Sequence, residues 1–60
     1  MNEDKAINYV QQQIMDNWRE VMKYEDQLRD IGNDDIIQAC VANAKERIEI
    51  YTLILNKLEQ

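Results

Sequence analysis

Apolar residues recur at alternating spacings of three and four in both halves of this 60-residue chain. In the first half the stripe runs through Ile7, Val10, Ile14, Asn17, Val21, Tyr24, Leu28 and Ile31, with Asn17 as its one polar member. In the second half it runs through Ile37, Val41, Ala44, Ile48, Tyr51, Leu55 and Leu58. Such spacing places side chains along one face of an α-helix, as at the a and d positions of a coiled coil. The pattern therefore predicts two long helices, each with a continuous seam.

A single glycine, Gly32, separates the two stripes, and the chain contains no proline. Glycine is common just past a helix end, because a left-handed backbone costs it little. We expect a helix over about 3–31, a turn at 32–33 in which Asn33 caps the next helix, and a second helix over about 34–58. A connection this short suits an antiparallel hairpin, so residues 1–60 are predicted to form one domain.

The two stripes also match one another when the chain is folded about this turn. The spacings of three and four residues along the first stripe match those along the second stripe when the latter runs in the opposite direction. The facing pairs are Leu28–Ile37, Tyr24–Val41, Val21–Ala44, Asn17–Ile48, Ile14–Tyr51, Val10–Leu55 and Ile7–Leu58. We therefore expect an all-α fold, an antiparallel two-helix hairpin that resembles a coiled coil.

A second apolar stripe lies beside the seam on each helix. Its residues are Met15, Trp18 and Met22 in the first helix and Ile36, Cys40, Ile50 and Ile54 in the second. The combined apolar arc is wider than one coiled-coil seam requires, and it predicts association into a four-helix bundle or a larger helical oligomer. The alternative is that these residues thicken the edge of a monomer. Because the two extra stripes fall on opposite sides of the hairpin, either the helices rotate, or the assembly exceeds a dimer, or one stripe binds a different partner.

The length of the chain favours the same conclusion. A domain of this size buries only about 60% of its unfolded surface and usually needs a disulfide, a metal or oligomerisation for stability. Cys40 is the only cysteine and there is no histidine, so neither an internal disulfide nor a zinc site is expected. A homo-oligomer remains, with a dimer favoured and no cofactor. Without a histidine to activate it, Cys40 is interpreted as a small buried residue.

Two residues of the first helix are candidates for specifying this assembly. A buried asparagine such as Asn17 can fix register or oligomeric state, and its facing residue Ile48 offers no hydrogen bond. Asn17 of the partner subunit could offer one; the alternative is contact with water. Trp18 lies between Met15 and Met22, and this combination forms an adaptable, large contact surface. We favour self-association over a foreign partner for it.

The predicted turn concentrates acidic residues. They are Glu25, Asp26, Asp30, Asp34 and Asp35, and we call them the acidic tip. A calcium-binding EF-hand loop starting at Asp30 would need glycine where Asp35 stands and glutamate where Val41 stands. The acidic tip is therefore interpreted as a solvated helix end with capping residues. The sharper alternative is a patch that imitates nucleic-acid phosphates and occupies a basic site on another protein.

These features favour an interaction protein over an enzyme. Two packed helices leave little concavity for a substrate, and carboxylate-bridged metal sites in bundles use histidines that this chain lacks. A net charge of −5 argues against direct nucleic-acid binding. No apolar run is long enough for a membrane span and no signal peptide is evident, so we expect a cytoplasmic protein.

The predicted function is therefore that of a small regulatory protein that self-associates and binds or inhibits another protein, as phage and plasmid accessory factors do. Two alternatives stay open. One is the acidic mimic, and the other is an oligomer that sequesters a small anion or nucleotide between subunits, with Lys45 or Arg47 as ligands.

In plan, residues 3–58 resemble the plasmid repressor-of-primer family, which also pairs two heptad-patterned helices of matching length through a tight turn. The resemblance implies hairpins that associate in pairs. That family binds RNA through a polar and basic helix face. The outward residues of the first helix here are mixed in sign, so RNA binding is not expected; they are Gln12, Asp16, Arg19, Lys23 and Asp26.

Overall fold

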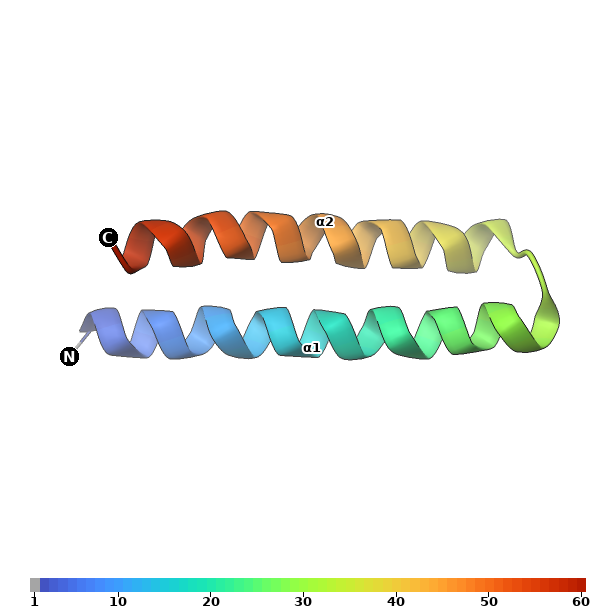
Figure 1. The fold of residues 1–60 in the computed structure, drawn as a ribbon, viewed down its shortest axis with the longest axis horizontal. Coiled ribbons are helices and arrows are strands. Elements are labelled where there is room, and N and C mark those ends of the chain that lie inside the picture. Colours follow the sequence, from blue (N-terminus) through green and yellow to red (C-terminus); the bar gives the residue numbers. More distant parts are fainter. Residues whose placement is uncertain (1) are drawn as a thin grey trace.

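The computed structural model describes residues 2–60 and contains two α-helices, α1 (Asn2–Ile31) and α2 (Asp35–Leu58). The helices lie side by side and run in opposite directions, so the start of α1 and the end of α2 meet at one end of the molecule (Figure 1). The molecule is a rod with extents of 45 × 14 × 12 Å. The predicted helical hairpin is confirmed. Within the described residues, neither helix has an apolar stretch that would cross a membrane.

The predicted seam lines the contact between the helices. Its buried members are Val10, Asn17, Val21, Ala44 and Ile48. Val21 and Ala44, one of the predicted facing pairs, are 1% and 0% exposed and form one cluster with Ile48. Ile14 and Val41 pack against this cluster from either side. The core is therefore a single line of small and branched side chains along the middle of the rod.

Ile31 departs from the seam pattern, because it is 63% exposed. It is the last residue of α1, and α2 begins only at Asp35. At that level of the rod there is no second helix to cover the side chain. The apolar stripe thus extends one residue further in the sequence than the contact extends in the structure.

The turn confirms the role of Gly32 and corrects that of Asn33. Gly32 has a φ of 85°, and its N–H donates to the carbonyl of Leu28 at 2.8 Å, which ends α1. The cap of α2 is Asp34, whose backbone is extended and whose carboxylate accepts from the N–H of Ile37 at 3.0 Å. The prediction that Asn33 caps α2 was wrong, and α2 starts one residue later than expected. Both residue types are good caps, but a carboxylate also interacts favourably with the positive end of the helix dipole.

Candidate interaction surfaces

Two ion pairs between the helices define two sides of the hairpin. Lys45 pairs with Glu25 at 3.7 Å, and Arg47 pairs with Glu20 at 3.1 Å. Residues two positions apart in a helix differ by about 200° around its axis. Lys45 and Arg47 therefore lie on opposite sides of the seam. We call the side of Lys45 the tryptophan side and the side of Arg47 the isoleucine side.

The tryptophan side carries the extra stripe of α1. Met15, Trp18 and Met22 are 51%, 46% and 63% exposed, so the single hairpin leaves about half of each side chain open to solvent. Lys45 and Glu49 lie beside them on α2, one helical turn apart, and both are exposed. This side is therefore apolar on one helix and charged on the other.

The isoleucine side carries the extra stripe of α2. Ile36, Ile50 and Ile54 are 77%, 50% and 41% exposed, and Cys40 is partly buried. Cys40 was expected to be a small buried residue, and the single hairpin covers it only in part. Arg47 lies between Cys40 and Ile50 and divides this apolar surface into one part near the turn and one near the open end.

Asn17 is 6% exposed, and both ends of its amide have partners inside the hairpin. Its Nδ2 donates to the carbonyl of Gln13 at 2.7 Å, and its Oδ1 accepts from Nε of Arg47 at 2.7 Å. The same guanidinium donates from Nη2 to Glu20. A carboxylate, a guanidinium and a buried amide thus form one polar layer across the seam. Among the described residues, no buried side-chain nitrogen or oxygen lacks a hydrogen-bond partner.

The sequence analysis placed only Ile48 opposite Asn17 and missed Arg47. An arginine directly beside the facing residue, with an acidic residue three positions after the asparagine, is the signal that would have revealed it. Asn17 consequently has its hydrogen-bond partners within one chain, and it needs none from a second copy of the chain. Its bond with Arg47 joins the two helices of one chain at this level.

The structure gives most of the acidic tip a local role. Asp34 caps α2, Asp26 forms an ion pair with Arg29, and Glu25 forms one with Lys45. Asp35 lies in the first turn of α2, where the helix dipole favours a negative charge. Of the five residues, Asp30 is left exposed at the end of α1 without such an account.

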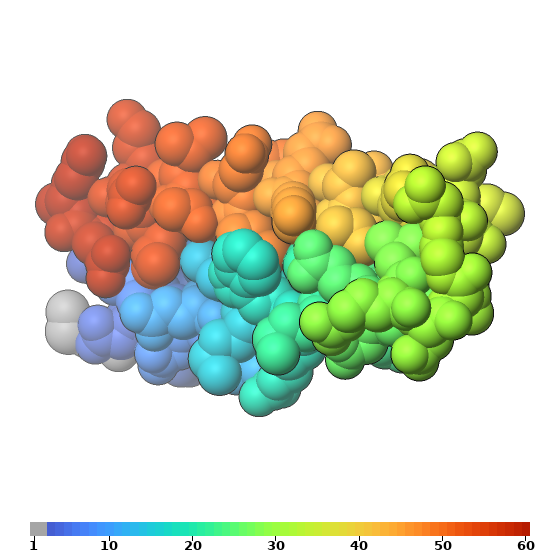
Figure 2. Space-filling model, turned by 45° about the vertical axis from the view of Figure 1, so that its right-hand side comes forward, coloured from blue at the N-terminus to red at the C-terminus, as the bar shows by residue number. Residues whose placement is uncertain are grey.

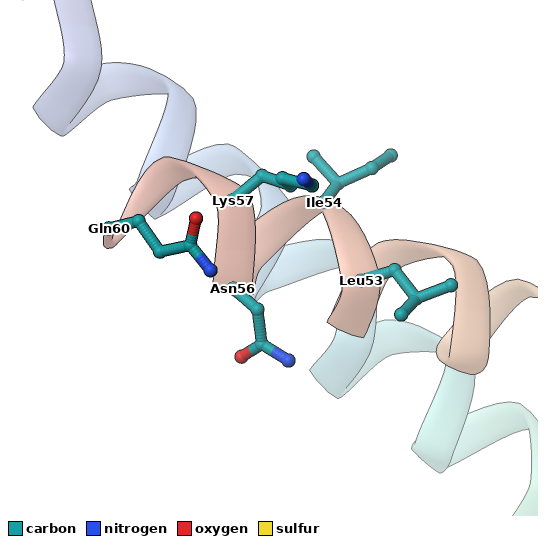
Figure 3. Close-up of a pocket in the computed structure, with 5 residues that line it drawn as sticks. All are labelled: Leu53, Ile54, Asn56, Lys57 and Gln60. Carbon is teal, nitrogen blue, oxygen red and sulfur yellow. The ribbon is translucent and has the colours of Figure 1, made fainter.

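Two shallow hollows on the surface are lined by residues of the second half of α2 and the C-terminal Gln60. One of about 360 Å³ is lined by Ile48, Glu49, Thr52 and Leu53. Another, of about 460 Å³, is lined by Leu53, Ile54, Asn56, Lys57 and Gln60, which project in different directions from the last turns of α2 (Figure 3). A hollow with walls from one helix alone encloses little of a small ligand. On the face shown in Figure 2, side chains of the two helices meet along the rod and leave no deep cleft between them.

Within the described residues, no group of three or more carboxylates and thiols is placed to hold a metal ion. No protein-family model, no curated protein and no solved structure matches this chain. The proposal for its function therefore depends on the two sides and their chemistry.

Proposed function

We propose that this protein is a small interaction protein that self-associates through exposed apolar surface into a four-helix or larger helical assembly, and in that form binds and regulates another protein. The observation that carries this proposal is the distribution of its large apolar side chains. Among the described residues nine are exposed, six of them on the tryptophan and isoleucine sides, whereas the buried core holds four apolar residues. A hairpin that leaves this many large apolar side chains exposed is typical of one half of a larger bundle.

The energetic balance supports association. Complete burial of a Leu, Ile, Met or Phe side chain stabilises by about 1.5–3 kcal/mol relative to exposure. A 60-residue chain has little stability to spare, and a second interface adds to it. One long side of a 45 × 14 × 12 Å rod offers roughly 600 Å² to a neighbour, which for two copies reaches the lower range of specific interfaces.

The two alternative functions receive less support from the geometry. Asp26, Asp34 and Glu25 of the acidic tip take part in capping or ion pairs, which leaves fewer free charges to imitate a phosphate backbone. Lys45 and Arg47 each pair with a carboxylate of their own chain, so neither is a free cation for a small anion.

The proposal is tested by the molar mass in solution over a wide concentration range, with helical content and thermal unfolding followed in the same samples. We expect a mass of two or more times 7.2 kDa and a melting temperature that rises with protein concentration. A mass of 7.2 kDa at every concentration, with a melting temperature that does not change, would contradict it.

A further inference from the structure

The tryptophan side of α1 has the same pattern when it is followed in either direction from Trp18. Met15 and Met22 lie on either side of it, and next come the polar residues Gln11 and Glu25. Each is at helical spacing from its neighbour, so all of them share one face of α1. A stripe with this symmetry can meet a copy of itself that runs in the opposite direction.

We infer that two copies of this chain join through the tryptophan side, antiparallel, across a two-fold axis that passes beside Trp18. The inference rests on the proposed self-association and specifies its geometry. In this arrangement Trp18 lies against the partner's Trp18, and Met15 lies against the partner's Met22. Glu25 faces the partner's Gln11, so no carboxylates oppose one another along α1. Such an interface is isologous, the usual form in symmetric dimers.

The same axis aligns charges on α2. Asn17 is bonded to Arg47, so the level of Trp18 on α1 corresponds to the neighbourhood of residue 47 on α2. An axis at that level is equally distant from Lys45 and Glu49. It therefore sets Lys45 opposite the partner's Glu49, and Glu49 opposite the partner's Lys45. Lys45 already pairs with Glu25 of its own chain at 3.7 Å, so across the interface each Lys45 lies between two carboxylates, Glu25 of its own chain and the partner's Glu49.

The angle between the two stripes of α1 makes this packing possible. The stripe with Trp18 is about 100° around the helix from the seam that contacts α2. A second hairpin placed against it completes a square, with α1 against α1 and α2 against α2, as in a four-helix bundle. Arg19 is at the outer rim, where its pairing with Asp16 reduces repulsion from its symmetry copy.

Two other arrangements oppose like charges. Parallel pairing of the tryptophan sides sets Glu25 against the partner's Glu25 and Lys45 against the partner's Lys45. A two-fold axis through the centre of the isoleucine side passes near residue 45 of α2. The contact of Val21 with Ala44 makes that level correspond to Glu20 on α1. Glu20 would then face the partner's Glu20. The isoleucine side is accordingly left outside the dimer.

Charge reversal on α2 tests the pairing. Lys45→Glu and Glu49→Lys each turn the two predicted attractions into repulsions, and we expect each variant alone to dissociate at about tenfold higher concentration. A mixture of the two restores opposite charges in the heterodimer, which should be tighter than either homodimer. Glu46→Lys is the matched control, because Glu46 is exposed on α2 outside the interface and its reversal should change nothing. Circular dichroism checks that each variant is helical.

Cysteine cross-linking tests the orientation. Gln11→Cys and Glu25→Cys are made separately in a Cys40→Ala background, mixed, and oxidised under mild conditions. The antiparallel dimer predicts mainly cross-links between the two different chains. A predominance of cross-links between identical chains would establish the parallel form and overturn the inference, and so would an oligomer that forms neither. A monomer at all concentrations would overturn the proposed function as well, so the molar mass separates the two failures.

Discussion

At the scale of single residues, the most informative group is Arg47 with the buried amide of Asn17. A buried polar group that loses its partner costs about 1–3 kcal/mol, whereas an exposed ion pair contributes less than about 1 kcal/mol. The bond from Arg47 to Asn17 satisfies a buried polar group, whereas the bond from Arg47 to Glu20 is an exposed ion pair. The two bonds of one guanidinium therefore differ in their consequences for stability.

We expect Arg47→Ala to lower the free energy of unfolding by about 1–3 kcal/mol, because it leaves the Asn17 oxygen buried without a donor. Glu20→Gln is the control and should lower it by less than about 1 kcal/mol. Urea unfolding at one fixed protein concentration measures both. Equal losses from the two variants would contradict the assignment.

A second change in the same layer checks the first. Asn17→Leu removes the buried amide, so in that background Arg47→Ala should cost much less than it does alone. The coupling between the two positions is obtained from the double-mutant cycle. Simple additivity of the two effects would show that the bond contributes nothing to stability.

At the scale of elements, the turn decides where each helix stops. The φ of 85° at Gly32 is in the left-handed region, and no atom is within 4 Å of the position that a Cβ would take. The cost of a side chain there is thus backbone strain without steric clash. Gly32→Ala should destabilise by about 1–2 kcal/mol.

Replacing Gly32 with D-alanine in a synthetic chain should instead raise the free energy of unfolding. The D-residue prefers the left-handed region and restricts the unfolded chain. Thermal unfolding of the two synthetic proteins at equal concentration measures the difference. Destabilisation by both residues would indicate a steric cause instead.

The cap of α2 gives a further prediction. Asp34→Ala should cost about 0.5–2 kcal/mol, since it removes the acceptor for the N–H of Ile37. Asn33→Ala should cost less, because Asn33 bonds only to the exposed side chain of Gln38. Urea unfolding of the two variants decides which residue is the cap, and the reverse order would restore the original assignment to Asn33.

Most of the fold could be predicted from the sequence, because burial along a helix has a fixed period and both halves obey it. The predicted register places Val21 near Ala44, and both residues lie in the one buried cluster. The cap could not be resolved between Asn33 and Asp34, since adjacent residues of similar chemistry compete for one position. The partner of Asn17 was missed because Arg47 lies outside the stripe and reaches the seam through its long side chain.

At the scale of the whole molecule, more large apolar side chains of the described residues are exposed than are buried in the seam. Trp18→Ala removes the proposed central contact of the tryptophan side, and we expect it to raise the dissociation constant of the proposed oligomer by about tenfold or more, which corresponds to burial of a large apolar side chain. Sedimentation equilibrium measures this change. Leu53→Ala is the control, because Leu53 is 67% exposed on α2 and lies outside the stripe of Met15, Trp18 and Met22 on α1. An equal effect of both variants would point to non-specific association.

The two termini of the hairpin lie at the same end of the rod, and this determines how the molecule would respond to mechanical force. The start of α1 and the end of α2 are adjacent (Figure 1), so opposing pulls on the two termini would peel the helices apart one layer after another, like a zipper, and would not slide them past one another in shear. The layer of Asn17 and Arg47 would meet the advancing fork partway along, after the layers of Val10 and Ile14. In an optical-tweezers experiment, we expect the separation of the helices to pause at this polar layer.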